Sequence, residues 1–412
     1  MKRVLLLPIG SSGDVNPFVW LGRQLRDSGH EVAVVANPFF ARTVEAAGLR
    51  HLPIGSEADY QTLTGNPALW HPTKGTPLVM RYAGEAAERY YEIIRREAER
   101  EANPPLVLAP VTAFGAMLAR EKLGITLISV NLQPSIYRSV HETPYFGRDF
   151  EFIGRLPRWA KRAFFSLVDW RINRELRPGL GRACRRQRIK TPRNPFRDWW
   201  QSPDGVICLW PEWFAAPQPD WPANARCIGF PLEDLASHRV ENAGLAEFLA
   251  GGGPPVLFTP GTAMAHGRNF FDAALGACLA AERRAIFVTR YPDQLPPNLP
   301  AAIRHFDYLP FSDVLPRCAA IVHHGGIGTT SQALAAGIPQ LIMPLAHDQP
   351  DNATRVRRLG AGTLLWPDEF TAENIARELD KLPAFQKQCA DLAARVRSDH
   401  PAAALLDALA HV

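Results

Sequence analysis

Short apolar runs alternate with segments of helical periodicity along this chain, and the alternation occurs in two separate stretches. In the first stretch, apolar runs at 4–9, 31–36, 106–109 and 126–131 alternate with helical patterns at 15–28, 41–47 and 114–123. In the second, apolar runs at 256–259, 285–289, 319–323 and 340–343 alternate with helical patterns at 270–280 and 330–336. Nearly continuous apolar strands between helices are typical of a parallel sheet covered on both faces. The sequence therefore predicts an α/β fold with two doubly wound parallel-sheet domains.

The length of the chain agrees with two domains, because 412 residues exceed one ordinary core and fit two of about 200 residues each. Five prolines within 211–231 indicate a linker. We therefore expect a first domain at 1–210, a linker at 211–240, a second domain at 241–385, and a C-terminal helix at 386–412 that crosses back to the first domain. Ligands of such sheets bind beyond the carboxyl ends of the strands, so the expected active site is the cleft between the halves.

Composition excludes several classes of protein. Hydrophobic residues make up 46% and charged residues 21%, which is the balance of a globular chain. The six cysteines are scattered without a C-x-x-C pair, which argues against a disulfide framework or a zinc site. The apolar run at 4–9 is too short for a signal peptide, and no stretch approaches the roughly 18 apolar residues of a membrane span. We expect a cytoplasmic protein, or one that sits on the inner face of a membrane without crossing it.

The formal net charge of +5 is unevenly distributed. Residues 155–193 hold thirteen Lys or Arg against two acids, so the rest of the chain is net acidic. A single basic segment makes nucleic-acid binding a poor inference from the overall charge.

The most informative motif is the octapeptide His-His-Gly-Gly-Ile-Gly-Thr-Thr at 323–330, which follows an apolar run and opens a helix. Glycines let a ligand approach the backbone, and a helix N-terminus offers free N–H groups to a diphosphate. His324 can donate to a phosphate oxygen, and Thr329 and Thr330 add hydroxyl donors. The alternative is a glycine-rich strand-to-helix turn with a buried histidine, since short glycine motifs often match by chance.

Further motifs follow at fixed intervals: Gly-Ile-Pro at 337–339, then Asp-Gln at 348–349 and Asn-Ala at 352–353. With the octapeptide they match H-G-G-x-G-T, G-x-P and D-Q-x-x-N-A in order. In this the chain resembles the nucleotide-sugar glycosyltransferases with two Rossmann-like domains (the GT-B fold), over essentially its whole length. Within that family it resembles most the rhamnosyltransferase B subunits of bacterial rhamnolipid synthesis, through 202–203, 213–215, 220–222 and 229–231.

The resemblance implies that the second domain binds the donor and the first domain the acceptor. By this match His324, Gly325, Gly326, Gly328 and Thr329 hold the phosphates, Asp348 and Gln349 grip the sugar hydroxyls, Tyr308 stacks on the base, and Gly261 and Thr262 face the diphosphate.

Gln332 departs from the family pattern, because many UDP-sugar users carry a glutamate there that accepts bonds from the ribose hydroxyls. A glutamine makes weaker, uncharged bonds, which fits dTDP-rhamnose somewhat better and leaves UDP-glucose open. The alternative is that Gln332 is an ordinary polar helix residue.

The first domain offers one carboxylate in a family motif, Gly-Ser-Ser-Gly-Asp-Val-Asn-Pro at 10–17. The acceptor hydroxyl must lose its proton as it attacks, so Asp14 is the candidate general base. The alternative is a simple helix N-cap. Family members with a histidine base pair it with an aspartate after a later strand, and 108–111 carries no carboxylate. Direct attack opposite the leaving group predicts inversion at the anomeric carbon.

No metal and no cofactor are expected beside the dTDP- or UDP-linked sugar as co-substrate. The sequence has no D-x-D triad, H-x-x-x-H pair or cysteine cluster. His324, the loop amides and the helix dipole would instead meet the charge of the leaving diphosphate.

The acceptor side is defined less sharply, and the candidates are Ser12, Gly13, Phe18, Trp70 and Phe114. Aromatic residues of this kind commonly belong to the core. The basic, aromatic segment at 155–170 is typical either of an interfacial helix on anionic lipid or of an amphipathic helix with a solvated basic face. Both agree with a lipophilic acceptor, and a partner protein that supplies the acceptor stays open.

Three rival functions remain. A nucleotide-sugar epimerase would share the fold and need clustered carboxylates in both domains. A Rossmann oxidoreductase would need G-x-G-x-x-G spacing, which 10–13 lacks. A non-catalytic or partner-dependent sugar-nucleotide-binding subunit is not excluded by motif alone.

Overall fold

The computed structural model describes residues 2–232, 243–262, 264 and 267–410. The chain divides into two compact units: 1–10, 14–231 and 400–412 form the first, and 11–13 and 232–399 form the second. Residues 211–231, expected as part of the linker, thus group with the first unit, and 233–240 lie outside the described residues.

The first unit is built on a seven-stranded sheet in which all neighbouring strands run parallel. Its order is β3-β2-β1-β4-β5-β6-β7, so the direction of strand addition reverses between β1 and β4. The strands are β1 (Arg3–Leu6), β2 (Glu31–Ala36), β3 (Arg50–Pro53), β4 (Leu106–Ala109), β5 (Leu127–Asn131), β6 (Val206–Cys208) and β7 (Ala225–Cys227).

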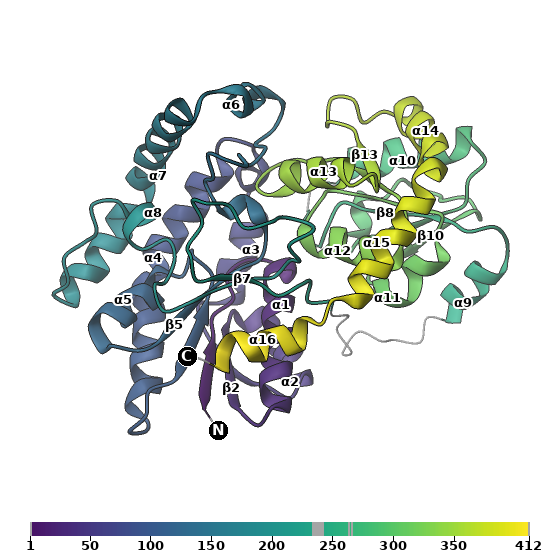
Figure 1. The fold of residues 1–412 in the computed structure, drawn as a ribbon. Helices are drawn as coiled ribbons and strands as arrows, with labels where there is room; N and C mark the ends of the chain where they lie inside the picture. The colour runs from purple at the N-terminus through teal and green to yellow at the C-terminus, as the bar shows by residue number, and fades with distance from the viewer. Residues whose placement is uncertain (1, 233–242, 263, 265–266, 411–412) are drawn as a thin grey trace. The chain divides into compact units, whose positions relative to one another are not determined.

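Helices cover both faces of this sheet (Figure 1). They are α1 (Ser12–Asp27), α2 (Ala41–Ala46), α3 (Glu57–Thr64), α4 (Gly75–Glu99), α5 (Phe114–Leu123), α6 (Phe152–Arg155), α7 (Arg158–Arg186), α8 (Pro195–Asp198) and α16 (Pro401–Ala410). Short 3-10 helices are η1 (Pro38–Phe40), η2 (Pro67–Trp70), η3 (Pro134–Ile136) and η4 (Arg148–Phe150).

The apolar pattern of β1 explains the two layers. Successive side chains of a strand point to opposite faces, so Leu5 packs under α4, α5 and α7, whereas Val4 and Leu6 pack under α1 and α2. Leu405 and Leu409 of α16 join the second of these clusters.

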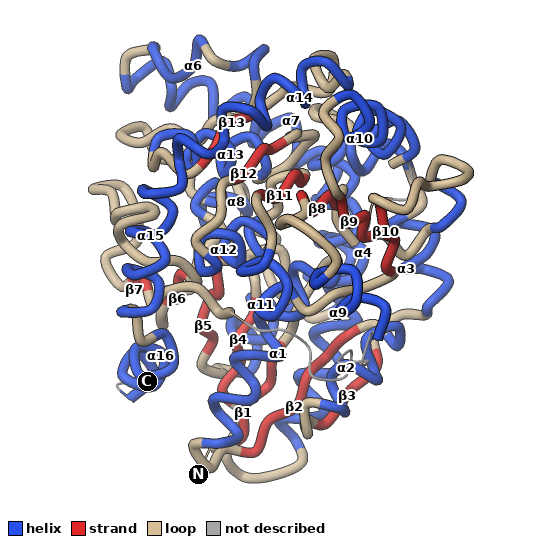
Figure 2. Tube along the Cα trace, turned by 90° about the vertical axis from the view of Figure 1, so that its right-hand side faces the viewer, coloured by secondary structure: helices blue, strands red, loops and turns tan. Residues whose placement is uncertain are grey.

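The second unit repeats this plan with six parallel strands in the order β10-β9-β8-β11-β12-β13. The strands are β8 (Val256–Thr259), β9 (Ala285–Val288), β10 (Ile303–Phe306), β11 (Ala320–His323), β12 (Gln340–Ile342) and β13 (Gly362–Leu364). The helices are α9 (Ala243–Ala250), α10 (Arg268–Ala280), α11 (Phe311–Val314), α12 (Ile327–Ala336), α13 (Gln349–Arg358), α14 (Ala372–Lys381) and α15 (Gln386–Ser398), with 3-10 helices η6 (Pro292–Gln294), η7 (Leu315–Arg317) and η8 (Leu382–Phe385). The strands are red in Figure 2, and in both units they alternate along the chain with helices, except that β7 follows β6 directly.

The predicted α/β class with two doubly wound parallel sheets is confirmed. In the described part of the chain, none of the helices combines the length and apolarity needed to span a bilayer.

Candidate functional site

The octapeptide turn lies where the second sheet reverses its direction of strand addition. It joins β11 to α12, and β11 pairs with β8 so that His323 stands opposite Thr259. The loop that begins after β8 and contains Gly261 and Thr262 therefore leaves the sheet beside the turn. This is the position at which doubly wound sheets bind ligands.

Close packing around His324 explains two of the glycines. A Cβ on Gly261, which has a φ of +99°, would lie 2.7 Å from the His324 ring, and a Cβ on Gly326 would lie 2.5 Å from its Nε2. Gly325 has a φ of +89°, and its Cβ would lie 2.8 Å from Ile342. Real Cβ atoms do not approach so closely, so the turn in this shape requires glycine.

The buried side chain of His323 stabilises the turn through two hydrogen bonds. It is fully buried, and its Nδ1 accepts a bond of 3.1 Å from the Gly325 amide. Its Nε2 must then carry the proton, which it donates to Gln340 Oε1 at 2.9 Å. Burial lowers the pKa of His323 to about 3, so the ring is neutral and structural.

His324 is the histidine of the pair that fits ligand binding. Burial lowers its pKa to about 4, so the imidazole is neutral near pH 7. Its Nδ1 has no hydrogen-bond partner among the described residues. A neutral imidazole with an unused ring nitrogen can donate to an anionic oxygen.

The N-terminus of α12 adds further donors. Gly326 occupies the N-cap position without a side-chain cap, and a Cβ on Gly328 would meet nothing within 4 Å. Open space beside the first turn of a helix suits a phosphate group.

Asp348 lies against the same turn. Asn352 Nδ2 donates both to Gly325 O at 2.9 Å and to Asp348 Oδ2 at 2.7 Å. Burial raises the pKa of the Asp348 carboxyl to about 6, although its bonds from Asn352 and the Ile327 amide favour the ionised form. A carboxylate beside the end of a bound diphosphate could accept bonds from sugar hydroxyls.

Gln349 has a different environment from Asp348. It is buried, and its Oε1 accepts bonds from the amides of Leu345 at 2.7 Å and Ala346 at 3.1 Å. In this structure its carbonyl oxygen therefore shapes the loop before α13.

The remaining donor-side candidates lie on three separate segments of the second unit: the loops after β8 and β10, and helix α12. Tyr308 is half-buried after β10, and the Arg290 guanidinium lies 5.8 Å from its ring centroid. Thr329 and Gln332 are half-buried on α12, and Thr262 is exposed.

Asp14 lies at the reversal of the first sheet, after β1, which is the counterpart of β8 in the second sheet. It belongs to the first turn of α1. Gly10 has a φ of +135°, and a Cβ there would lie 2.1 Å from Asp14 Oδ2. The carboxylate thus rests on the bare Cα of Gly10, a placement that only glycine permits.

The acceptor-side candidates separate into two groups. Ser12 and Gly13 lie with Asp14 in the first turn of α1, and Trp70 is half-buried at the end of η2. Phe18 and Phe114 are completely buried in the apolar clusters of the sheet faces. Both lie on the sides of their helices that cover the sheet, so their role in this structure is packing.

Sequence reasoning missed Gln340 and assigned no role to His323 or Asn352. The only available signal for Asn352 was its place in the D-Q-x-x-N-A motif, because contacts across 27 residues are not visible in a pattern. Within the described residues there is no group of three or more His, Cys, Asp or Glu able to hold a metal.

Comparison with known proteins assigns the family. A sequence model of the glycosyltransferase family 28 N-terminal domain matches residues 4–141. One of the erythromycin biosynthesis protein CIII-like C-terminal domain matches 285–407.

The O-mycaminosyltylonolide 6-deoxyallosyltransferase of Streptomyces fradiae is 31% identical over 386 residues, which cover 87% of this chain and 84% of the relative. The vancomycin aglycone glucosyltransferase of Amycolatopsis orientalis is 27% identical, over 99% of this chain and 98% of the relative.

The fold agrees with this assignment. The spinosyn rhamnosyltransferase SpnG complexed with thymidine diphosphate superposes over 100% of both chains, with a TM-score of 0.69 and 19% identity. The chain therefore belongs to the GT-B glycosyltransferases that use nucleotide-sugar donors and join a family 28 N-terminal domain to an erythromycin CIII-like C-terminal domain.

Proposed function

We propose that this glycosyltransferase transfers a hexose, with inversion, from a nucleoside diphosphate to a hydroxyl group of a lipophilic acceptor. The observation that carries the proposal is the glycine turn before α12, where an uncapped helix N-terminus, the buried and unpaired Nδ1 of His324 and the carboxylate of Asp348 lie together. The helix N-terminus and His324 suit the phosphates of a donor, and the carboxylate of Asp348 suits its sugar.

In the proposed mechanism Asp14 is the general base. Its carboxylate takes the proton of the acceptor hydroxyl as the oxygen attacks the anomeric carbon from the face opposite the nucleotide. The bond between that carbon and the diphosphate oxygen breaks, and the diphosphate leaves with the electron pair. His324 and the first amides of α12 stabilise its charge, so no metal is needed.

For the donor we favour a thymidine diphosphate sugar such as dTDP-rhamnose over UDP-glucose. Gln332 supports this preference, because an uncharged amide gains less from a ribose 2′-hydroxyl than a glutamate would. Thymidine diphosphate is the ligand named for SpnG, and dTDP for the glycosyltransferase VinC, which has a TM-score of 0.68.

For the acceptor we propose a large, lipophilic alcohol. Support comes from the relatives, whose names specify O-mycaminosyltylonolide, the vancomycin aglycone and, in Arabidopsis thaliana, a sterol. A rhamnolipid-type acceptor belongs to the same chemical class.

The test is a thermal-shift screen of the purified protein against dTDP, UDP, dTDP-rhamnose, dTDP-glucose, UDP-glucose and NAD. A ligand that binds the folded state raises the melting temperature, by an amount set by its concentration relative to Kd. Stabilisation by the dTDP series alone supports the rhamnosyl-type donor, and stabilisation by UDP-glucose moves the assignment to a glucosyltransferase.

Two outcomes would contradict the proposal. No shift with any diphosphate would favour a partner-dependent subunit. Conversion of the bound sugar to its epimer without any acceptor would favour a nucleotide-sugar epimerase.

A further inference from the structure

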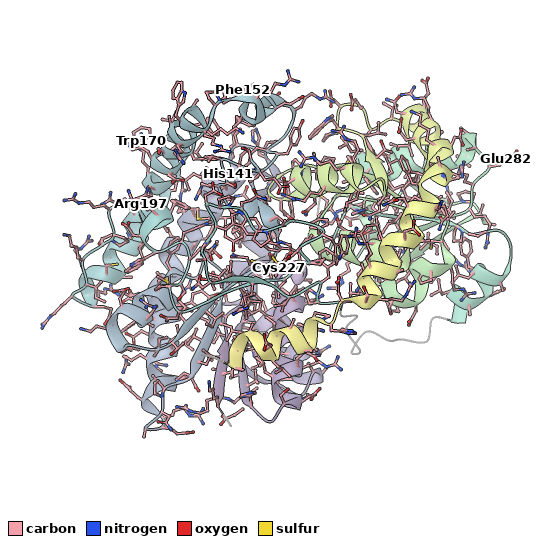
Figure 3. All side chains as sticks on the ribbon, in the orientation of Figure 1. His141, Phe152, Trp170, Arg197, Cys227 and Glu282 are labelled. Carbon is pink, nitrogen blue, oxygen red and sulfur yellow. The ribbon has the colours of Figure 1, made fainter. Side chains whose placement is uncertain are left out.

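Exposed apolar side chains concentrate on one small part of the first unit. Eight large apolar residues are exposed within the described part of the chain, and four of them lie on α6 and the first half of α7. These four are Phe152 at 53% exposure, Trp159 at 72%, Leu167 at 62% and Trp170 at 58%. Figure 3 labels Phe152 and Trp170 on these two helices. Large apolar groups gathered in water usually mark an interaction site.

The spacing on α7 places three of the four on one side of the helix. Trp159, Leu167 and Trp170 are separated by eight and three residues, so at 3.6 residues per turn they form one stripe. The other side of α7 carries Phe165 and Ile172, which are buried. Because that inner side packs on the unit, the stripe is held facing outward.

A buried ion pair fixes the helix behind the stripe. Asp169 of α7 lies 3.0 Å from Arg138, and both side chains are largely buried. The Arg138 guanidinium also lies 4.5 Å from the Phe196 ring centroid and 5.1 Å from that of Trp200. The acid nearest to the stripe is therefore already neutralised from the inside.

Arginines surround the stripe. Arg158 and Arg162 are exposed and have no carboxylate partner among the described residues. Arg174 lies 5.5 Å from the Trp170 ring centroid. Arg155, with 82% of its side chain exposed, pairs with Glu151 at 3.2 Å, and Arg171 pairs with Glu175 at 3.6 Å. The surface is therefore both aromatic and strongly cationic.

We infer that this α6–α7 surface (Phe152, Trp159, Leu167 and Trp170 with Arg155, Arg158, Arg162 and Arg174) docks on an anionic lipid bilayer. Tryptophan and phenylalanine insert at the boundary of head groups and acyl chains, while arginine binds lipid phosphates. The core of a protein interface is depleted of charge, whereas here arginines alternate with the exposed aromatic residues. Charge complementarity therefore selects the bilayer, and the inference does not depend on the donor or the acceptor.

The test is sedimentation of the full chain with phosphatidylcholine vesicles, with and without phosphatidylglycerol. The protein should pellet with the anionic vesicles and be released by salt. Trp159→Ser with Trp170→Ser should lower the partition coefficient about tenfold or more, through lost burial of both rings. Arg158→Glu with Arg162→Glu should lower it by at least roughly fivefold for each arginine.

Matched controls lie in the second unit. Leu279, at 57% exposure, serves as the apolar control in Leu279→Ser, and the exposed Arg317 as the charge control in Arg317→Glu. Neither should change vesicle binding. All variants should keep the wild-type melting temperature and its shift with dTDP or UDP, because the replaced side chains are exposed.

Three results would overturn the inference: no pelleting with either vesicle, equal pelleting of wild type and variants, or loss of a dimer in the tryptophan variant without any vesicle binding. The last would assign the surface to a second copy of the chain. Failure of the proposed transferase activity would leave vesicle binding unchanged, so the two failures can be told apart.

Discussion

The turn after β1 and the turn after β11 each lie where a doubly wound sheet reverses its direction of strand addition, one before and one after the reversal, yet they are built for opposite charges. The turn after β11 has three glycines and a neutral histidine, and its helix N-terminus is free of a side-chain cap. The turn after β1 instead places the Asp14 carboxylate over a glycine. The topology thus places both turns at a sheet reversal. Their side chains determine whether the turn can bind an anion or accept a proton.

The largest expected effect tests the proton side of this comparison. Asp14→Asn should lower kcat by roughly 10²–10⁴-fold, because the amide cannot take the acceptor proton. The melting temperature and the affinity for the donor should change little, and single-turnover kinetics with the donor bound would measure the loss. Asp27→Asn, at the exposed end of the same helix, is the matched control. Retention of full activity in Asp14→Asn would assign the base elsewhere.

The next prediction concerns the anion side. Gly328→Ala should leave the unliganded protein as stable as wild type, because the new Cβ meets nothing within 4 Å. It should nevertheless weaken dTDP or UDP binding roughly 10- to 100-fold, since the methyl group occupies the approach to the helix amides. Titration calorimetry would measure both nucleotides.

Gly326→Ala provides the contrast, because its Cβ collides with the His324 ring and should cost about 1–3 kcal/mol of stability. Gly253→Ala, also in open space, should change neither property. Unchanged nucleotide affinity in Gly328→Ala would break the anion half of the comparison.

A pH dependence should distinguish Asp348 from His324. The pKa of Asp348 is about 6 and that of His324 about 4, so only the aspartate changes its charge between pH 7.5 and 5. Sugar hydroxyls bind best to the ionised carboxylate, so nucleotide-sugar affinity should fall about tenfold as the pH drops through this range. Asp348→Asn should bind weakly and without this slope, whereas a flat wild-type profile would exclude Asp348 as the sugar ligand.

The smallest expected effect concerns the nucleotide. Gln332→Glu should raise the affinity for UDP relative to dTDP by about fivefold, through a charge-assisted bond to the 2′-hydroxyl. Gln388→Glu adds the same charge at an exposed position of α15 and should not alter the ratio. An unchanged ratio in Gln332→Glu would mean that this side chain does not face the ribose.

The sequence predicts the strands of the two sheet centres well, because strands buried on both faces are continuously apolar. The bounds of β2, β4 and β8 are those expected. Strands β3, β6, β7, β10 and β13, at or next to the sheet edges, were not predicted. Strands β6, β7 and β13 have only three residues, and polar side chains interrupt the apolar runs of β3 and β10. Helix α12 begins at Ile327 rather than 330, because the glycines that open it look like a turn in sequence.

For the candidate site, the sequence identifies the turn and its motifs but not what supports them. The bonds of His323 to Gln340 and of Asn352 to Gly325 join residues from different elements. Phe18 and Phe114 were named as acceptor-side candidates but are fully buried. The sequence alone does not distinguish an aromatic residue of the core from one that lines a binding pocket. Only packing separates the two.

The position of α16 has a consequence for synthesis of the chain. Leu405 and Leu409 complete an apolar cluster whose other members come mainly from the first 130 residues or so. A ribosome makes the whole of 232–399 before it reaches them, so the first unit begins to fold earliest and yet finishes last. Until then the surface beneath α16 is an uncovered apolar face. Such a face is prone to aggregation, so it has to be covered by a chaperone or exposed only briefly before α16 is made.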